Sequence, residues 1–399
     1  MVMTENGAGI AFNPYVGAIE APPIAEARSW IRPDADQPLI DVTQAVPGYP
    51  PATELVAHLA EAVTEAETAG YTEIEGIEPL RAALATHMRG CYGGSVDAEQ
   101  VLIAAGCNQA FFLTALALAR PGDNILLPVP YYFNHRMSLD MLGIEARFLP
   151  CRAAAGLVPD PDEAASLIDR RTRAILLISP NNPTGAVYSE TCINEFFALA
   201  ERRGIALILD ETYKDFLPAD RDRPHRLYDR PDVWQTLIQL YSFSKAYCLP
   251  GYRVGAVLAD RRVLTQIAKV MDCVSICAPH VGQRAALFGL NHLDAWRADK
   301  RALMNRRVET FLAALEGSAS GFEPVSAGAY FAYLKHPFDA TRADDLARRL
   351  AAEQALLCLP GTMFGPGQGS YLRFAFANVA DAVLADLTAR LAAFSEQNN

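Results

Sequence analysis

One lysine of the chain, Lys245, lies in a setting that could make its amine a nucleophile. It follows an apolar run in the pattern Ser-x-Ser-Lys, with Ser242 and Ser244 before it and Arg253 after it. Loss of water and nearby cations both lower the pKa of an amine, which favours Schiff-base chemistry with a carbonyl group. The two hydroxyls and the guanidinium are suited to binding a phosphate dianion. This cluster argues against the ordinary alternative, a lysine that extends into water.

A carboxylate occupies a similar position at the end of another apolar run, Ala206–Asp210. An ionised Asp210 is costly there unless it is paired with a cation. A protonated pyridine nitrogen would be such a partner and would keep an aromatic cofactor an electron sink. Tyr213 could present its phenol to the same ring. The spacing leaves open the alternative that Asp210 only caps a helix.

Three further segments follow apolar runs. Gly106, Cys107 and Asn108 precede a helical pattern, so their backbone amides could bind phosphate at a helix N-terminus. The ring of Tyr132 could stack on a flat ligand, although an aromatic residue at such a place is more often part of the core. The third segment, SPNNPTG, spans residues 179–185. Because ligands bind beyond the carboxyl ends of strands in open α/β sheets, all these segments are expected to meet in one crevice.

The elements that must position these residues alternate between strands and helices, which predicts an α/β fold. Several runs are apolar on both faces, as in a largely parallel sheet covered by helices. The expected strands are Val101–Ala104, Ile125–Leu127, Glu145–Leu149, Ala174–Ser179, Ala206–Asp210, Gln239–Ser242 and Val254–Leu258. The expected helices cover about residues 53–67, 78–89, 108–119, 136–142, 161–168, 189–203 and 262–273.

A second, smaller α+β unit is expected after a long helical pattern at about residues 294–316. Its strands are predicted at Ala329–Leu334, Leu356–Leu359 and Tyr371–Phe376, and its helices near 342–352 and 380–395. The Pro- and Gly-rich first 50 residues would pack on this unit as an arm. We therefore expect an arm over residues 1–50, a large domain over 51–290 and a small domain over 291–399.

Composition excludes several other classes of protein. The 399 residues are 51% hydrophobic and carry a formal net charge of −11, which predicts two domains and disfavours nucleic acid as a partner. No apolar run approaches the roughly 20 residues of a membrane span, and no secretory signal is readable, so we expect a cytoplasmic protein. Among the eight cysteines, Cys273 and Cys277 could share a helix face, but we expect reduced thiols and no metal site.

Taken together, the motifs resemble those of the class I and II aminotransferases of fold type I, the family of aspartate aminotransferase. NPTG at 182–185, D-x-x-Y at 210–213, S-x-S-K at 242–245, G-x-R-x-G at 251–255 and Arg373 occur in the family's order. The resemblance implies a mostly parallel seven-stranded sheet in the large domain, a smaller α+β domain and pyridoxal 5′-phosphate as cofactor. The NPTG turn also predicts a cis peptide between Asn182 and Pro183.

The resemblance also implies a role for each matching residue. Lys245 would bind the cofactor as a Schiff base and carry the reaction's proton, and Asp210 would pair with the pyridine nitrogen, supported by His135. Asn182 and Tyr213 would bond to the cofactor's 3′ oxygen. Arg373, together with Asn182, would bind the substrate carboxylate, and Tyr132 would stack on the ring. The phosphate would be bound by Ser242, Ser244, Arg253 and the amides of Gly106, Cys107 and Asn108, with Tyr71 reaching it from the neighbouring subunit of a homodimer.

The implied reaction is transfer of an α-amino group from an amino acid to a 2-oxo acid, by a ping-pong mechanism through the pyridoxal and pyridoxamine forms of the cofactor. Other reactions of the same scaffold stay open, namely β-elimination from cysteine conjugates, decarboxylation and cyclisation. A cofactor-sensing regulator with a helix-turn-helix module is disfavoured, because no basic segment of about 70 residues precedes the arm.

Three positions depart from the family's pattern. Ala45 replaces a common glycine, so we expect a different placement of the arm over the substrate. Cys107 and Asn108 replace small hydroxylic residues in the phosphate loop. The segment 271–281 lacks the Arg that dicarboxylate-specific members supply from the partner subunit, although Arg284 lies close in sequence. This absence disfavours aspartate or glutamate as the preferred amino donor.

Overall fold

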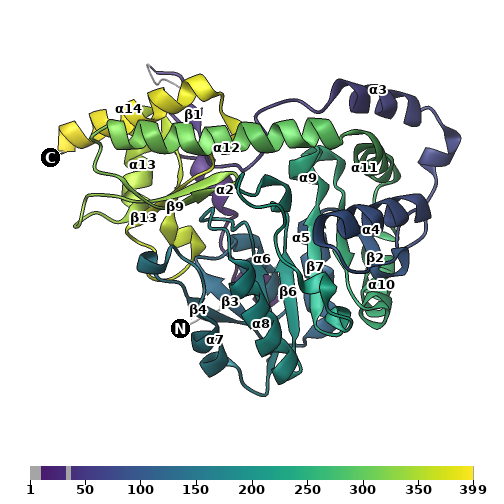
Figure 1. The fold of residues 1–399 in the computed structure, drawn as a ribbon. Helices are drawn as coiled ribbons and strands as arrows, with labels where there is room; N and C mark the ends of the chain where they lie inside the picture. The colour runs from purple at the N-terminus through teal and green to yellow at the C-terminus, as the bar shows by residue number, and fades with distance from the viewer. Residues whose placement is uncertain (1–9, 33–36, 399) are drawn as a thin grey trace.

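The computed structural model describes residues 10–32 and 37–398 (Figure 1). The remaining residues of the predicted arm, 1–9 and 33–36, and the terminal Asn399 lie outside the described residues. The fold is α/β, as expected, with a seven-stranded sheet and a smaller layer built mainly from the C-terminal residues. None of the helices in the described ranges is both long enough and apolar enough to cross a membrane.

The large sheet is mostly parallel. Strand β8 runs antiparallel to both of its neighbours, β2 and β7, whereas all other neighbouring strands are parallel. In spatial order the strands are β2 (Val101–Ala104), β8 (Gly255–Leu258), β7 (Leu237–Ser242), β6 (Ala206–Asp210), β5 (Thr172–Ile178), β3 (Asn124–Val129) and β4 (Glu145–Pro150). The central strands are almost entirely buried, which explains why they are apolar on both faces.

Helices cover this sheet, and several begin directly after the strands that carry the motifs. Helix α5 (Cys107–Leu118) follows β2 and packs on β7 and β8, and α8 (Glu190–Arg203) packs on β5 and β6. The others in this part of the chain are α3 (Thr53–Ala62), α4 (Glu78–Tyr92), α6 (Phe133–Met141), α7 (Pro161–Leu167), α9 (Phe243–Ala246), α10 (Arg261–Ser275) and α11 (His280–His292).

The smaller layer contains an antiparallel sheet in the order β12 (Leu359–Pro360), β13 (Tyr371–Phe374), β10 (Phe331–Lys335) and β9 (Glu323–Gly328). Three helices accompany it: α12 (Asp294–Gly317), α13 (Ala343–Gln354) and α14 (Asp381–Asn398). The long α12 runs across the top of Figure 1, from beside α11 to this layer.

The N-terminal arm packs on the smaller layer, as predicted. Its strand β1 (Ile40–Asp41) pairs in parallel with β11 (Leu356–Leu357). Two short helices precede it, α1 (Pro14–Gly17) and α2 (Pro23–Arg28). The arm is therefore tied to the C-terminal part of the chain by main-chain hydrogen bonds.

Several predicted elements differ from the structure. The expected strand over 356–359 is two strands, β11 and β12, and strand β9 was not expected. Helix α11 was also missed because it contains Gly282 and Gly289, which weaken a helical pattern. Packing requires both glycines: a Cβ would lie 2.4 Å from the Tyr252 carbonyl oxygen at Gly282 and 2.7 Å from the Tyr247 ring at Gly289.

Cys273 and Cys277, whose spacing would allow it, do not share a helix face. Helix α10 ends at Ser275, and Ile276 has a positive φ of 63°, which turns the chain away before Cys277. The sulfur of Cys277 instead accepts a contact of 3.5 Å from the backbone amide of Thr72.

Candidate active site

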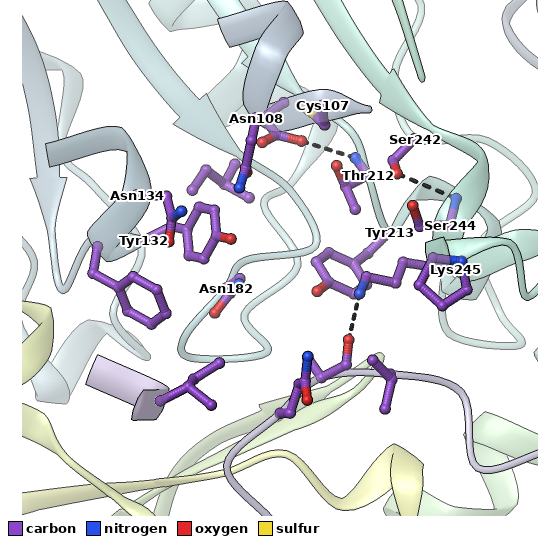
Figure 2. Close-up of a pocket in the computed structure, with 18 of the residues that line it drawn as sticks. Cys107, Asn108, Tyr132, Asn134, Asn182, Thr212, Tyr213, Ser242, Ser244 and Lys245 are labelled. Atoms are coloured by element: carbon purple, nitrogen blue, oxygen red, sulfur yellow. Dashed lines mark hydrogen bonds between the residues drawn. The ribbon is translucent and has the colours of Figure 1, made fainter. Parts of the chain in front are cut away.

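A cavity of about 390 Å³ lies at the carboxyl ends of the central strands (Figure 2). Strands β5, β6 and β7 and the N-terminus of α5 border it from the large sheet, and β13 and the arm border it from the smaller layer. The structure thus brings together residues that are far apart in sequence. The predicted site residues that line the cavity are Cys107, Asn108, Tyr132, Asn182, Asp210, Tyr213, Ser242, Ser244, Lys245, Arg253 and Arg373.

Lys245 lies on the short helix α9, which begins directly after β7. Its Nζ donates a hydrogen bond to the main-chain carbonyl of Ala45 in the arm, as Figure 2 shows. Burial, together with the positive charges of Arg253 and Arg373, lowers the pKa of Lys245 to about 8. The amine can therefore lose its proton close to neutral pH, as a nucleophile or base requires.

Asp210 is the last residue of β6, and its side chain is buried beside His135. His135 Nε2 lies 3.3 Å from Asp210 Oδ2, beside the carboxylate as the resemblance implies, although the contact does not have the geometry of a hydrogen bond. The Thr212 amide donates to Asp210 Oδ1 at 3.0 Å. Burial opposes ionisation of Asp210, but His135 and Thr212 outweigh it and hold the pKa below its usual value. Asp210 is therefore an anion that a buried cation could pair with.

The loop at the N-terminus of α5 has the predicted features of an anion site. Gly106 precedes the helix with φ of 88°, and Arg253 has a left-handed φ of 51°. The Arg253 guanidinium donates to the carbonyls of Pro250 at 2.9 Å and Ala105 at 3.2 Å. A Cβ at Gly106 would lie 2.5 Å from Arg253 Nη2, so a side chain there would displace the guanidinium from this position. Free amides at a helix N-terminus beside this cation suit a phosphate group.

Two hydroxyl groups complete this end of the cavity. Ser242 and Ser244 are both buried, and Ser242 Oγ accepts a hydrogen bond of 3.2 Å from the Ser244 amide (Figure 2). This turn keeps both side chains beside Lys245, at the end of β7. The predicted cluster of two hydroxyls, an amine and a guanidinium therefore exists in space.

Arg373, on β13, provides the cation at the other end of the cavity. It is 1% exposed and lies against the rings of Phe331 and Phe364, with centroid distances of 5.3 and 5.0 Å. Its Nη1 donates to Asn182 Oδ1 at 3.3 Å, its Nη2 donates to the Thr43 carbonyl, and its Nε is buried without a partner among the described residues. Burial lowers its pKa to about 10, so the group stays charged at neutral pH. The carboxylate of a bound substrate would accept hydrogen bonds from this guanidinium and balance its charge.

Asn182 and two tyrosines surround the middle of the cavity. The Asn182–Pro183 bond is cis, as predicted. Burial raises the pKa of Tyr213 well above its usual value and that of Tyr132 to about 12. Both phenols therefore keep their protons at neutral pH and can donate hydrogen bonds.

Three predicted residues do not line the cavity of this chain. Gly106 and His135 lie behind it, against Arg253 and Asp210. Tyr71 is 79% exposed and lies outside this cavity. Arg284 is paired with Glu65 at 2.7 Å.

The sequence analysis missed several lining residues. Thr212, whose amide orients Asp210, could have been found from its position two residues after an Asp at a strand end, which is typical of a side-chain-capped turn. The others carry no such signal because they are apolar or amide residues: Pro22, Ile24, Gln44, Val46, Phe133, Asn134, Ile178 and Pro250.

Comparison with known proteins decides the family. The family described as aminotransferase class I and II matches residues 37–391. The chain belongs to this family. It is therefore an aminotransferase, an enzyme of the pyridoxal-phosphate-dependent transferases, and the expected resemblance, fold class and reaction class are confirmed. The lyase, decarboxylating, cyclising and regulatory alternatives are not favoured.

Relatives of this aminotransferase are distant in sequence but cover most of its length. It is 26% identical to an aspartate aminotransferase of Thermotoga maritima, over 88% of this chain and 90% of the relative. It is also 26% identical to an aromatic aminotransferase of Arabidopsis thaliana, over 93% of each. A solved single mutant of Thermus thermophilus aspartate aminotransferase has 25% identity and a TM-score of 0.88, over 96% of this chain and all of the other. The names of these relatives differ in amino acid substrate.

Proposed function

We propose that this aminotransferase binds pyridoxal 5′-phosphate in the described cavity and moves an α-amino group from an amino acid to a 2-oxo acid by a ping-pong mechanism. The observation that carries the proposal is Lys245, a half-buried amine whose pKa is lowered to about 8 and which lines the same cavity as Arg253 and Arg373. A cytoplasmic location remains a prediction from the sequence.

The residues of the cavity fit the cofactor. Arg253, the amides at the N-terminus of α5 and the hydroxyls of Ser242 and Ser244 would bind its phosphate. Gly106 supports the fit because a side chain there would displace the Arg253 guanidinium. At the other end of the ring, ionised Asp210 would pair with the pyridine nitrogen. Tyr213 and Asn182 would donate to the 3′ oxygen, and Tyr132 would stack on the ring.

Bound pyridoxal phosphate supplies a conjugated ring that can delocalise the electron pair left when the substrate α-carbon loses its proton. The chain's residues make that loss of a proton possible. Arg373, with Asn182, holds the substrate carboxylate and so fixes the orientation of the α-carbon. Lys245 Nζ accepts the α-proton and returns it later in the cycle, which its lowered pKa favours. Asp210 keeps its charge because His135 and Thr212 stabilise the anion.

We also propose a homodimer with shared active sites. Tyr71 supports this proposal because its side chain is 79% exposed and lies outside the cavity of its own chain. In a dimer it would complete the phosphate site of the neighbouring subunit.

Borohydride reduction of the holoenzyme, followed by peptide mapping, tests the assignment of Lys245. The pyridoxyl group is expected on Lys245, and the Lys245→Ala variant should carry no label. Recovery of the label on another lysine of the wild-type chain would refute the proposal.

A further inference from the structure

We propose that the preferred amino donor carries an uncharged, apolar side chain rather than a second carboxylate. This inference rests on the proposed function, because it assigns the substrate class of the same cavity. It differs from the aspartate named for the Thermotoga and Thermus relatives.

The first argument is that every cation in the cavity wall already has a task. Among residues 10–32 and 37–398, the cations lining the cavity are Lys245, Arg253 and Arg373. Lys245 is the nucleophilic amine, Arg253 binds phosphate and Arg373 binds the α-carboxylate. A second carboxylate would enter the cavity without a charged partner from this chain, and an unpaired buried carboxylate is strongly disfavoured.

The second argument is an apolar wall that leads away from Arg373. The Phe364 ring lies 5.0 Å from the Arg373 guanidinium and 5.9 Å from the ring of Phe133, which lines the cavity. Ile24 of α2 packs on the same cluster and lines the cavity too. A side chain that extends from an α-carbon held near Arg373 would therefore meet carbon surface, and burial of apolar groups there favours binding.

Pro22 and Val46 of the arm add to this carbon surface. Two polar residues that also line the cavity, Gln44 and Asn134, have neutral amide side chains. A further cation of the arm, Arg28, contacts one of these residues: its Nη2 donates to Gln44 Oε1 at 3.2 Å. Arg28 is exposed to water and does not line the cavity. Its charge is screened there, so it is a poor partner for a substrate carboxylate.

The test measures how fast each amino acid converts the bound cofactor of the purified holoenzyme to its amine form. Leucine, methionine and phenylalanine are compared with aspartate and glutamate. We expect kcat/KM to be at least about tenfold higher for the best apolar donor than for either dicarboxylate. Faster conversion by aspartate or glutamate would overturn this inference alone and would indicate a cation from Arg28 or from the partner subunit. Failure of every amino acid to convert the cofactor would overturn the proposed function as well.

A charge-introducing variant tests the position of the wall. Ile24→Arg should raise the ratio of kcat/KM for aspartate to that for leucine by at least about tenfold, because it supplies the missing cation. The matched control is Ile24→Gln, which should lower leucine turnover without improving aspartate turnover. Ile24 is only half-buried, so both variants should fold, and Val46→Arg provides a second position on the same wall. An unchanged ratio in both arginine variants would contradict the proposed wall.

Discussion

At the scale of single residues, burial sets the charge of the groups that face the cavity. It lowers the pKa of Lys245 to about 8 and that of Arg373 to about 10. Asp210 shows the opposite balance, because its contacts with His135 and Thr212 outweigh burial. Near neutral pH, Arg373 is therefore a cation, Asp210 is an anion and the Lys245 amine is close to its pKa.

The pKa of Lys245 predicts how cofactor capture depends on pH. Only the neutral amine attacks a carbonyl, and its fraction falls about tenfold for each pH unit below the pKa. The rate constant for binding of pyridoxal phosphate to the cofactor-free protein should therefore rise with pH and level off above about pH 8. Stopped-flow absorbance of the bound cofactor measures this rate. A rate that still rises at about pH 10 would indicate an ordinary lysine pKa.

His135 is expected to position Asp210 rather than to touch the substrate. Removal of its ring in His135→Ala should leave the cofactor bound but lower kcat about tenfold, or about 1.4 kcal/mol in activation free energy. His135→Asn keeps a side-chain N–H donor and should recover part of the loss. Asp210→Ala should be far more damaging because it removes the partner of the pyridine nitrogen.

The measurement for these variants combines kcat with the visible spectrum of the bound cofactor. His135 also packs on Phe111, with ring centroids 4.2 Å apart, so thermal unfolding separates a loss of packing from a catalytic effect. Equal kcat values for His135→Ala and the wild type would contradict the positioning role.

At the scale of elements, the start of α5 and the turn at Arg253 must approach each other closely. The antiparallel pairing of β2 with β8 brings them together, because Ala104 lies opposite Gly255. A Cβ at Gly255 would lie 2.9 Å from the Cys107 amide nitrogen. The close approach of this loop to Arg253 therefore depends on Gly106, just after β2, and on Gly255, at the start of β8.

Gly106→Ala tests this close approach. The added Cβ would displace the Arg253 guanidinium, so the Kd for pyridoxal phosphate should rise at least about tenfold. Gly122→Ala is the matched control, because Gly122 has a similar φ of 90° but no atom within 4 Å of the added Cβ. Both variants should lose about 1–3 kcal/mol of stability from backbone strain. Cofactor titration and thermal unfolding measure the two effects, and an equal rise of Kd in both variants would contradict the role of Gly106.

At the scale of the whole molecule, the cavity lies between the large sheet and the smaller layer. The residues of the large sheet fall within 101–258, and those of the antiparallel sheet fall within 323–374. We propose that this separation reflects the domain boundaries at residues 51 and 291. The arm contacts both parts, since Thr43 accepts from Arg373 and Ala45 accepts from Lys245.

The proposed dimer predicts complementation between two impaired variants. In a mixed dimer of Lys245→Ala and Tyr71→Ala, one site has lost both residues and the other has kept both. An equimolar mixture that has exchanged subunits should therefore recover about a quarter of the wild-type activity, since half of the dimers are mixed and each has one complete site. Activity of the mixture and mass in solution measure this effect. A fully active monomer would rule out shared sites.

The sequence alone determined the reaction class and most of the large sheet. Val101–Ala104 and Ala206–Asp210 have the predicted bounds because buried strands are continuous apolar runs. Asp210, which ends one buried strand, and Lys245, which follows another, could be identified as candidate site residues. A charged side chain at such a place is costly unless it has a partner or a chemical role. Elements whose form depends on close packing, such as α11 with its two glycines, gave no local signal.

Only the tertiary structure decided how the arm meets the site. Ala45 was noted as a departure from the family's pattern, yet its role comes from a main-chain carbonyl that accepts from Lys245, and any residue type has that carbonyl. The apolar wall of Ile24, Val46 and Phe133 likewise depends on three segments meeting in space. Carbonyl acceptors and apolar surface are present throughout any sequence, so their function is set by where the fold places them, whereas a buried charge is rare enough to be recognised from its sequence context.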